Sequence, residues 1–231
     1  MKYVKKCYSA LDGIWVLTNS DKTEFDNNLG IESKVLYNPL PKNDSVSTTY
    51  EEGYVLFAGR LEREHKGLDY LIDVIKKISE EVPKLRVTII GDGPSHNWLK
   101  AEIERTGLGE KVNLLGTTDN VYQFYGRASV MVQTSRWEGF GMTILEAMSC
   151  GIPVVAFHNY GPDEIIRDSV DGYLVDHFDT EAFAKKVVEI LKQPEQRKQM
   201  GKCAIERSQD FSLEKVLPLF KQYLEEAAKG L

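Results

Sequence analysis

Residues 135–151 read SRWEGFGMTILEAMSCG and lie between two short apolar runs, at 128–133 and 152–157. This order predicts a strand, a tight glycine turn, a helix over Met142–Ser149 and a second strand. Gly139 and Gly141 lack a Cβ atom, so the chain can turn sharply there and a bulky anion can approach the unpaired amides at the start of the helix. The stretch therefore predicts an anion-binding turn.

Two carboxylates flank this turn. Glu138 precedes it, and Glu146 lies about 1.5 turns into the helix, at roughly 3.6 residues per turn. A carboxylate accepts two hydrogen bonds at once, which suits a vicinal diol such as a ribose or a sugar edge. An anion site between two such acceptors fits a nucleotide sugar. Two unrelated glutamates on an ordinary strand-turn-helix unit explain these residues equally well, because a single G-x-G is a weak signal.

The alternation of strands and helices continues in both directions from this stretch. Short apolar runs predict strands at 54–58, 85–90, 112–115, 130–133, 154–157 and 173–175, with helices between them and two more at 194–208 and 212–229. The order is typical of an α/β fold with a doubly wound parallel sheet, in which ligands bind outside the carboxyl ends of the strands. Glycines follow four of these strands and should meet at one crevice: Gly59, Gly91 with Gly93, Gly116, and Gly139 with Gly141.

The composition of the 231 residues is that of a globular protein and excludes several functions. A net charge of -6 disfavours nucleic acid as a partner, and no apolar run approaches the ~18 residues of a membrane span. The three cysteines form no C-x-x-C pair, so we expect reduced thiols and a cytoplasmic location. The four histidines lack metal-ligand spacing and no Asp-x-Asp pair occurs, so we expect a metal-independent protein without a cofactor.

Two basic residues follow the strand at 54–58. Arg60 should lie at the carboxyl end of this strand and Lys66 at the start of the next helix, so both can reach the crevice. A planar guanidinium binds phosphate oxygens in pairs, and a flexible ammonium adds a point charge. A solvated charged loop is the other interpretation, and it is the one that we give to residues 62–64.

With these residues the chain resembles the retaining glycosyltransferases of family 4, the glycosyl transferases group 1, which have the GT-B fold. The resemblance rests on Gly59-Arg60, on Lys66-Gly67, and on Glu138 and Glu146 with seven residues between them. The segments 152–155 and 171–175 also match. The resemblance covers about residue 35 to the C-terminus and implies the C-terminal, Rossmann-like donor-binding domain.

The resemblance also implies a role for each residue. Arg60 and Lys66 would hold the diphosphate of a UDP- or GDP-sugar, and Glu138 would bind the transferred sugar; these three form the expected catalytic set. The expected donor site adds Gly59, Gly139, Phe140, Gly141, Met142, Glu146, Asn120 and Val121. In it Glu146 would accept the ribose hydroxyls, and the base would lie near residues 116–121. The sugar would pass to an acceptor hydroxyl with retention, through electrostatic stabilisation of the leaving diphosphate.

The chain departs from the family pattern in two places. Tyr160-Gly161 stands before the Pro-Asp-Glu-Ile-Ile segment, where two glycines are usual. Residues 1–42 are also too few for a second wound domain, which needs on the order of 100–150 residues. We expect a fragment: 1–42 as the remnant of an N-terminal acceptor domain, 43–52 as a linker, 53–208 as the nucleotide-sugar-binding domain and 209–231 as a helix that crosses back.

This division gives further expectations. Within 1–42 we expect an amphipathic helix through residue 11, a buried strand at 14–18, a helix capped by Asn19, Ser20 or Asp21, and a strand at 34–37. A glycan or glycolipid acceptor would bind through the missing part, and the full-length protein could lie at the inner membrane face. Pro218 should bend the last helix. Residues 14–17 and this helix should expose apolar surface, which should promote self-association.

Three other functions remain open from the sequence. A GT-B-shaped epimerase or phosphorylase needs a further base or a pyridoxal-binding lysine, and formation of an epimer without a glycoside would identify it. A non-catalytic, transferase-like partner subunit would bind nucleotide without turnover. An NAD enzyme is disfavoured, because residues 91–94 lack the third glycine of the dinucleotide fingerprint.

Overall fold

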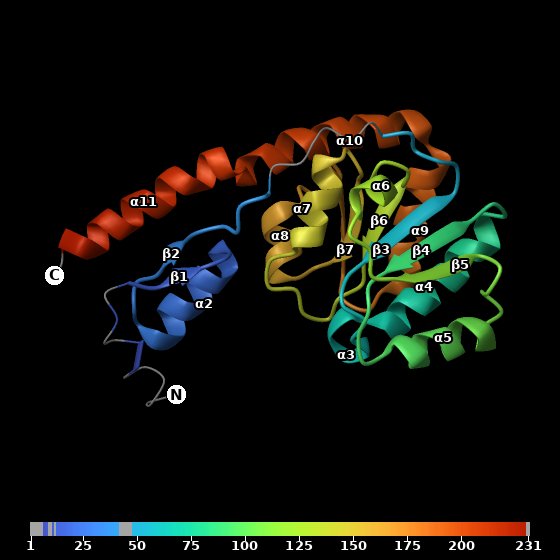
Figure 1. The fold of residues 1–231 in the computed structure, drawn as a ribbon, viewed down its shortest axis with the longest axis horizontal. Helices are drawn as coiled ribbons and strands as arrows, with labels where there is room; N and C mark the ends of the chain where they lie inside the picture. Colours follow the sequence, from blue (N-terminus) through green and yellow to red (C-terminus); the bar gives the residue numbers. More distant parts are fainter. Residues whose placement is uncertain (1–6, 9–10, 12, 42–47, 230–231) are drawn as a thin grey trace.

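The computed structural model describes residues 7–8, 11, 13–41 and 48–229. Its main part is a six-stranded sheet with the order β5-β4-β3-β6-β7-β8, in which each neighbouring pair is parallel (Figure 1). The strands are β3 (Tyr54–Ala58), β4 (Arg86–Ile90), β5 (Val112–Gly116), β6 (Val130–Gln133), β7 (Val154–Phe157) and β8 (Gly172–Val175). The predicted doubly wound α/β sheet is confirmed, and the strand ends differ from the prediction by one residue at most.

Helices cover both faces of this sheet, because the strands are apolar on both sides. In β3, Val55 and Phe57 pack into the apolar core on one face, whereas Leu56 and Ala58 pack into the core on the other. The first face carries α4 (Leu68–Glu81), α5 (His96–Arg105) and α9 (Thr180–Lys192). The second carries α6 (Tyr122–Tyr125), α7 (Met142–Ser149), α8 (Tyr160–Ile165) and α10 (Pro194–Ser208).

The charged segment after β3 differs from the prediction. Instead of a solvated loop, the structure has a single helical turn, α3 (Arg63–Lys66). Arginine, glutamate and lysine are good helix formers, so these residues are compatible with the turn. It ends at Gly67, whose φ of +60° lets the chain redirect itself into α4.

The N-terminal residues form a small β-α-β unit beside the main sheet (Figure 1). Strands β1 (Trp15–Val16) and β2 (Lys34–Val35) pair in parallel, and α2 (Asn19–Leu29) connects them. Thr18 caps α2 by accepting a hydrogen bond from the amide of Asp21, so the predicted caps were wrong by one residue or more. The strand is also shorter and less buried than predicted, since Trp15 is 39% exposed. The helix predicted through residue 11 falls mainly outside the described residues, and so does the first half of the predicted linker 43–52.

The last helix, α11 (Leu213–Lys229), leaves the main domain and passes beside the N-terminal unit (Figure 1). The ring of Trp15 lies 5.6 Å from that of Phe220 and 6.4 Å from that of Tyr223. The helix is not interrupted at Pro218, and the bend expected there stays a prediction. The apolar side chains of Leu213, Leu217, Phe220 and Leu224 are exposed, as predicted, and so is that of Leu219. Self-association through them stays a prediction, as do the domain boundaries. None of the described helices is long and apolar enough to cross a membrane.

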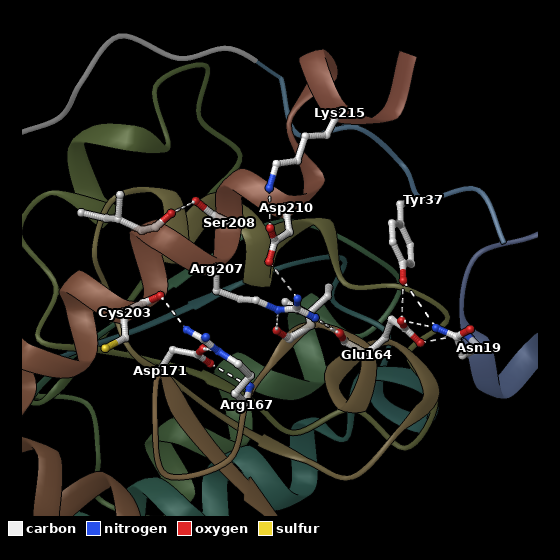
Figure 2. Close-up of polar contacts among 12 residues, drawn as sticks. Asn19, Tyr37, Glu164, Arg167, Asp171, Cys203, Arg207, Ser208, Asp210 and Lys215 are labelled. Atoms are coloured by element: carbon white, nitrogen blue, oxygen red, sulfur yellow. Dashed lines mark hydrogen bonds and ion pairs between the residues drawn. The ribbon is translucent and has the colours of Figure 1, made fainter. Parts of the chain in front are cut away.

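A polar network fixes the N-terminal unit to the end of α8 (Figure 2). The carboxylate of Glu164 accepts hydrogen bonds from the Asn19 amide at 2.8 Å, from Asn19 Nδ2 at 2.7 Å and from Tyr37 Oη at 2.6 Å. Burial, together with Glu164, raises the pKa of Tyr37 to about 12, so its hydroxyl stays a donor. From α10, Arg207 donates to the carbonyl oxygens of Glu164 at 2.6 Å and Ile165 at 3.0 Å. The C-terminal end of this short helix is therefore held by the N-terminal unit and by α10.

Candidate functional site

The candidate site lies where the strand order reverses. Strands β3 and β6 are neighbours in the sheet, while the chain continues from β3 toward β5 and from β6 toward β8. The two connections therefore diverge at the carboxyl ends of β3 and β6, which is where sheets of this kind have their ligand-binding crevice. Gly59 and Arg60 follow β3, and residues 134–141 follow β6. The predicted site segments thus meet at the predicted edge of the sheet.

The segment that carries Lys66 is attached directly to the segment that carries Glu138. Thr134 Oγ1 donates to the carbonyl oxygens of Lys66 and Gly67, each at 3.1 Å. The amide of Arg136 donates to the carbonyl oxygen of His65 at 2.9 Å. A Cβ on Gly67 would lie 2.0 Å from the carbonyl oxygen of Thr134, so only glycine allows this approach.

Arg136 makes a second connection between the two segments. Its Nη1 and Nη2 donate to Oδ1 and Oδ2 of Asp69 at 3.0 and 2.6 Å, and its guanidinium lies 4.2 Å from the ring centroid of Tyr70. Burial alone would raise the pKa of Asp69, but the hydrogen bonds and charge of Arg136 outweigh it and lower this pKa. Sequence analysis gave Arg136 no role; the structure shows that it ties the start of α4 to the site.

Lys66 and Glu138 form an ion pair at this edge of the sheet. Lys66 Nζ lies 2.6 Å from Glu138 Oε2, and their side chains are only 15% and 11% exposed. The same Oε2 accepts hydrogen bonds from Gln133 Nε2 at 2.6 Å and from Ser135 Oγ at 3.3 Å. No described residue donates to Oε1 of Glu138. One carboxylate oxygen is therefore saturated by the protein, and the other is available to a ligand.

Arg60 behaves differently from Lys66. Its side chain is 71% exposed, and its Nε lies 3.9 Å from Oε2 of Glu62, which is too long for a hydrogen bond. The guanidinium can therefore turn toward an anion without breaking a strong contact. Its predicted approach to residues 139–142 stays a prediction.

The glycine turn before α7 is formed chiefly by Gly141. Its φ is +101°, and α7 begins at the next residue, Met142. Gly139 lies in a bend just before it, with its φ outside the left-handed region and open space around its α-carbon. The side chain of Phe140 is buried, with its ring stacked 5.9 Å from that of Tyr37. Phe140 can therefore contribute only its main chain to the crevice.

Glu146 lies on α7, where it is partly buried. Tyr125 Oη donates to its Oε2 at 3.1 Å. Burial raises the pKa of Glu146, and the hydrogen bond from Tyr125 offsets part of this rise. Asn120 is exposed and Val121 half-buried, at the end of the loop that leads into α6. Because the hydroxyl of Tyr125 connects α6 to Glu146 of α7, this loop is brought toward Glu146. The contact of the loop with the nucleotide base stays a prediction.

Residues Tyr125, Gln133 and Asn159 were missed by the sequence analysis. Asn159 Oδ1 accepts from the Glu138 amide at 3.3 Å, and its Nδ2 donates to the carbonyl oxygen of Ser135 at 3.0 Å. Gln133 could have been noticed, because it is a polar residue that ends a buried strand at the ligand edge. Asn159 and Tyr125 carry no such signal, since their contacts depend on the packing of separate elements.

The loop before α8 packs against the same turn. The amide of Gly161 donates to the carbonyl oxygen of Glu138 at 3.1 Å, and a Cβ on Gly161 would lie 2.0 Å from the carbonyl oxygen of Phe140. The Tyr160-Gly161 sequence therefore keeps the glycine that the close contact requires.

The described residues contain no group of three or more His, Cys, Asp or Glu side chains that could hold a metal ion. The metal independence expected from the sequence stays a prediction.

Comparison with known proteins identifies the family. The model of the family "Glycosyl transferases group 1" matches residues 42–207, which include the whole crevice. The chain belongs to the glycosyl transferases group 1 family. Among group 1 relatives, an uncharacterized glycosyltransferase of Methanocaldococcus jannaschii is 32% identical over 92% of this chain and 61% of its own length. The poly(glycerol-phosphate) alpha-glucosyltransferase of Bacillus subtilis is 26% identical over 87% of this chain and 31% of its own length.

The fold of this group 1 domain agrees with solved structures. A mutant of S. aureus TarM, crystallised with fondaparinux, alpha-GlcNAc-glycerol and UDP, superposes with a TM-score of 0.89 at 25% identity. The match covers 98% of this chain and 46% of TarM. The expected GT-B glycosyltransferase fold is thereby confirmed. The chain spans less than two thirds of the length of each of these proteins.

Proposed function

We propose that this chain is the donor-binding part of a retaining family 4 glycosyltransferase, which transfers a hexose-type sugar from a nucleoside diphosphate sugar to a hydroxyl group. The observation that carries the proposal is the Lys66–Glu138 pair in the crevice, next to the glycine turn that opens α7. A cation beside unpaired helix amides suits a diphosphate, and the open oxygen of Glu138 suits sugar hydroxyls.

The proposed chemistry is electrostatic. Lys66, Arg60 and the amides of residues 139–142 bind the diphosphate, and Glu146 accepts the ribose hydroxyls. When the bond between the sugar C1 and the diphosphate oxygen breaks, negative charge grows on that oxygen, where preorganised donors stabilise it. The acceptor oxygen forms the new bond to C1, and its proton passes to the departing phosphate. No protein nucleophile or metal ion is required in this scheme.

The relatives suggest a uridine donor and a polyol or glycan acceptor. TarM was crystallised with UDP and alpha-GlcNAc-glycerol, and the Bacillus relative is named for glucosyl transfer to poly(glycerol-phosphate). We therefore propose UDP-glucose or UDP-N-acetylglucosamine as donor, and a cell-surface polysaccharide or polyol phosphate polymer as product. Acceptor contacts would come largely from parts of the protein outside this chain, which is proposed to act in the cytoplasm.

A calorimetric titration of the chain with UDP-glucose, UDP-N-acetylglucosamine and GDP-mannose tests the proposal. We expect saturable binding of at least one UDP-sugar, in competition with UDP and unaffected by EDTA. Binding of GDP-mannose alone would show that the base of the donor is guanine and not uracil. Absence of binding to all three donors would contradict the proposed function.

Donor binding should also weaken at low pH because of Glu146. Burial raises its pKa, so the carboxylate takes up a proton at a higher pH than an ordinary glutamate, and a neutral carboxyl is a poorer acceptor for ribose hydroxyls. The dissociation constant for UDP-glucose should therefore rise as the pH is lowered through this raised pKa. Glu146→Gln should bind more weakly at pH 7.5, with a much flatter pH profile. Equal profiles for the two proteins would contradict the role of Glu146.

A further inference from the structure

Gln133 occupies an unusual position at the end of β6. Its side chain is 1% exposed, and its Nε2 donates to Oε2 of Glu138 at 2.6 Å. The amide oxygen, Oε1, is buried and has no hydrogen-bond partner among the described residues. Because both atoms belong to one planar amide, fixing the nitrogen on Glu138 also fixes the unpaired oxygen.

This arrangement is unfavourable for stability alone. A buried polar atom without a partner costs stability, whereas an apolar side chain of similar shape is often neutral or better. Such an atom in a folded protein calls for an explanation outside stability. The favourable contact of Gln133 is the one to Glu138, so the explanation should be sought there.

Oε2 of Glu138 accepts short hydrogen bonds from Lys66 and from Gln133, and the proposed function removes the one from Lys66. Lys66 would move its charge to the diphosphate of the donor, while Ser135 Oγ is a longer contact at 3.3 Å. Gln133 is neutral and buried at the end of β6, so a bound diphosphate does not draw its side chain away from Glu138. It is then the short contact that keeps Oε2 in place while Oε1 faces the sugar.

We propose that Gln133 is a positioning residue that orients Glu138 toward the sugar of the donor once Lys66 has turned to the diphosphate. This inference rests on the proposed function. It predicts that Gln133 affects the recognition of the sugar and leaves the recognition of the nucleotide unchanged.

The test compares UDP with UDP-glucose, or with whichever UDP-sugar binds best, for the wild-type chain and Gln133→Leu. Affinity for the UDP-sugar should fall about tenfold, the usual effect of losing a hydrogen bond to a charged group. Affinity for UDP should change less than about twofold, and the melting temperature should stay equal or rise. Gln196→Leu is the matched control, because Gln196 also has a buried unpaired Oε1 but contacts Tyr173 and Glu189 of β8 and α9. It should alter neither affinity.

A second variant, Gln133→Glu, adds a readout that a structural role would not give. The charged group in contact with Glu138 is Lys66 of α3, whereas Ser135 and Asn159 are neutral. Two adjacent carboxylates raise the pKa of one of them, and the protonated form can donate to its neighbour as the amide did. Relative to wild type at each pH, this variant should bind the UDP-sugar poorly at pH 8 and recover as the pH is lowered.

The outcomes separate the two proposals. A parallel loss of UDP and UDP-sugar affinity in Gln133→Leu, a lower melting temperature, or no change at all would overturn the role of Gln133 while leaving the proposed function standing. If the wild-type chain binds neither UDP nor any UDP-sugar, the proposed function fails, and the inference fails with it.

Discussion

Lys66→Ala should weaken binding of a nucleoside diphosphate sugar by about tenfold to a hundredfold, the range expected for losing a charge-assisted hydrogen bond to phosphate. Lys66 is largely buried beside Glu138, so its charge acts in a poorly solvated place where it counts for more than on the surface. Arg60→Ala should have a smaller effect, because the exposed guanidinium is screened by water. Calorimetry with the best donor measures both, and the double variant should bind least.

Two controls sharpen this experiment. Lys76→Ala removes an exposed lysine of α4 and should leave affinity unchanged. Lys66→Ala also leaves Glu138 without its cation, which could lower stability by itself. The pair Lys66→Ala with Glu138→Gln removes both charges and should regain stability without regaining donor affinity. Full donor affinity in Lys66→Ala would refute the assigned role of the lysine.

Gly67→Ala should lower the free energy of unfolding by about 3 kcal/mol or more. A left-handed φ costs a residue with a Cβ about 1–2 kcal/mol, and overpacking costs about 1–3 kcal/mol more. Both apply here, because φ is +60° and the new Cβ would lie 2.0 Å from the carbonyl oxygen of Thr134. Urea unfolding measures the loss. Donor binding should weaken as well, since the clash separates Lys66 from Glu138.

Gly107→Ala isolates the steric part of this effect. Its φ of +72° is similar, but nothing lies within 4 Å of the position of a Cβ. We expect a loss of about 1 kcal/mol from the backbone conformation alone. If Gly67→Ala and Gly107→Ala lowered the free energy of unfolding equally, the close approach of α3 to the segment after β6 would not be the reason for glycine at position 67.

The sheet could be predicted because its signals are local. Apolar runs of four to six residues separated by amphipathic helices define parallel strands, and β3, β6 and β7 were found with their observed ends. Helix α3 could not be predicted in the same way. Four charged or polar residues suit a loop and a helical turn equally well, and the contacts of Arg136 with the carbonyl oxygens of Arg63 and Glu64 settle the choice.

Within the site, the pattern of residue types was sufficient to select Lys66, Glu138 and Glu146 as candidates, and their roles stay predictions. Charged groups next to glycines at strand ends are visible in any single sequence, and the sheet rule brings those ends together. The sequence did not show whether each of these side chains is paired, exposed or buried. The pairing of Lys66 with Glu138, the exposure of Arg60 and the inward side chain of Phe140 depend on how α3, α7 and the N-terminal unit pack.

Chain periodicity and the order of its glycines predicted the wound sheet and the edge that carries the site, and the charged residues beside those glycines carried the family resemblance. Tertiary packing decided which oxygen of Glu138 is free, that Gln133 and Tyr125 hold the two glutamates, and that Glu164 anchors the N-terminal unit. The physical reason is range: strand and turn preferences act over a few neighbouring residues, whereas a hydrogen bond between separate elements depends on the positions of the whole backbone.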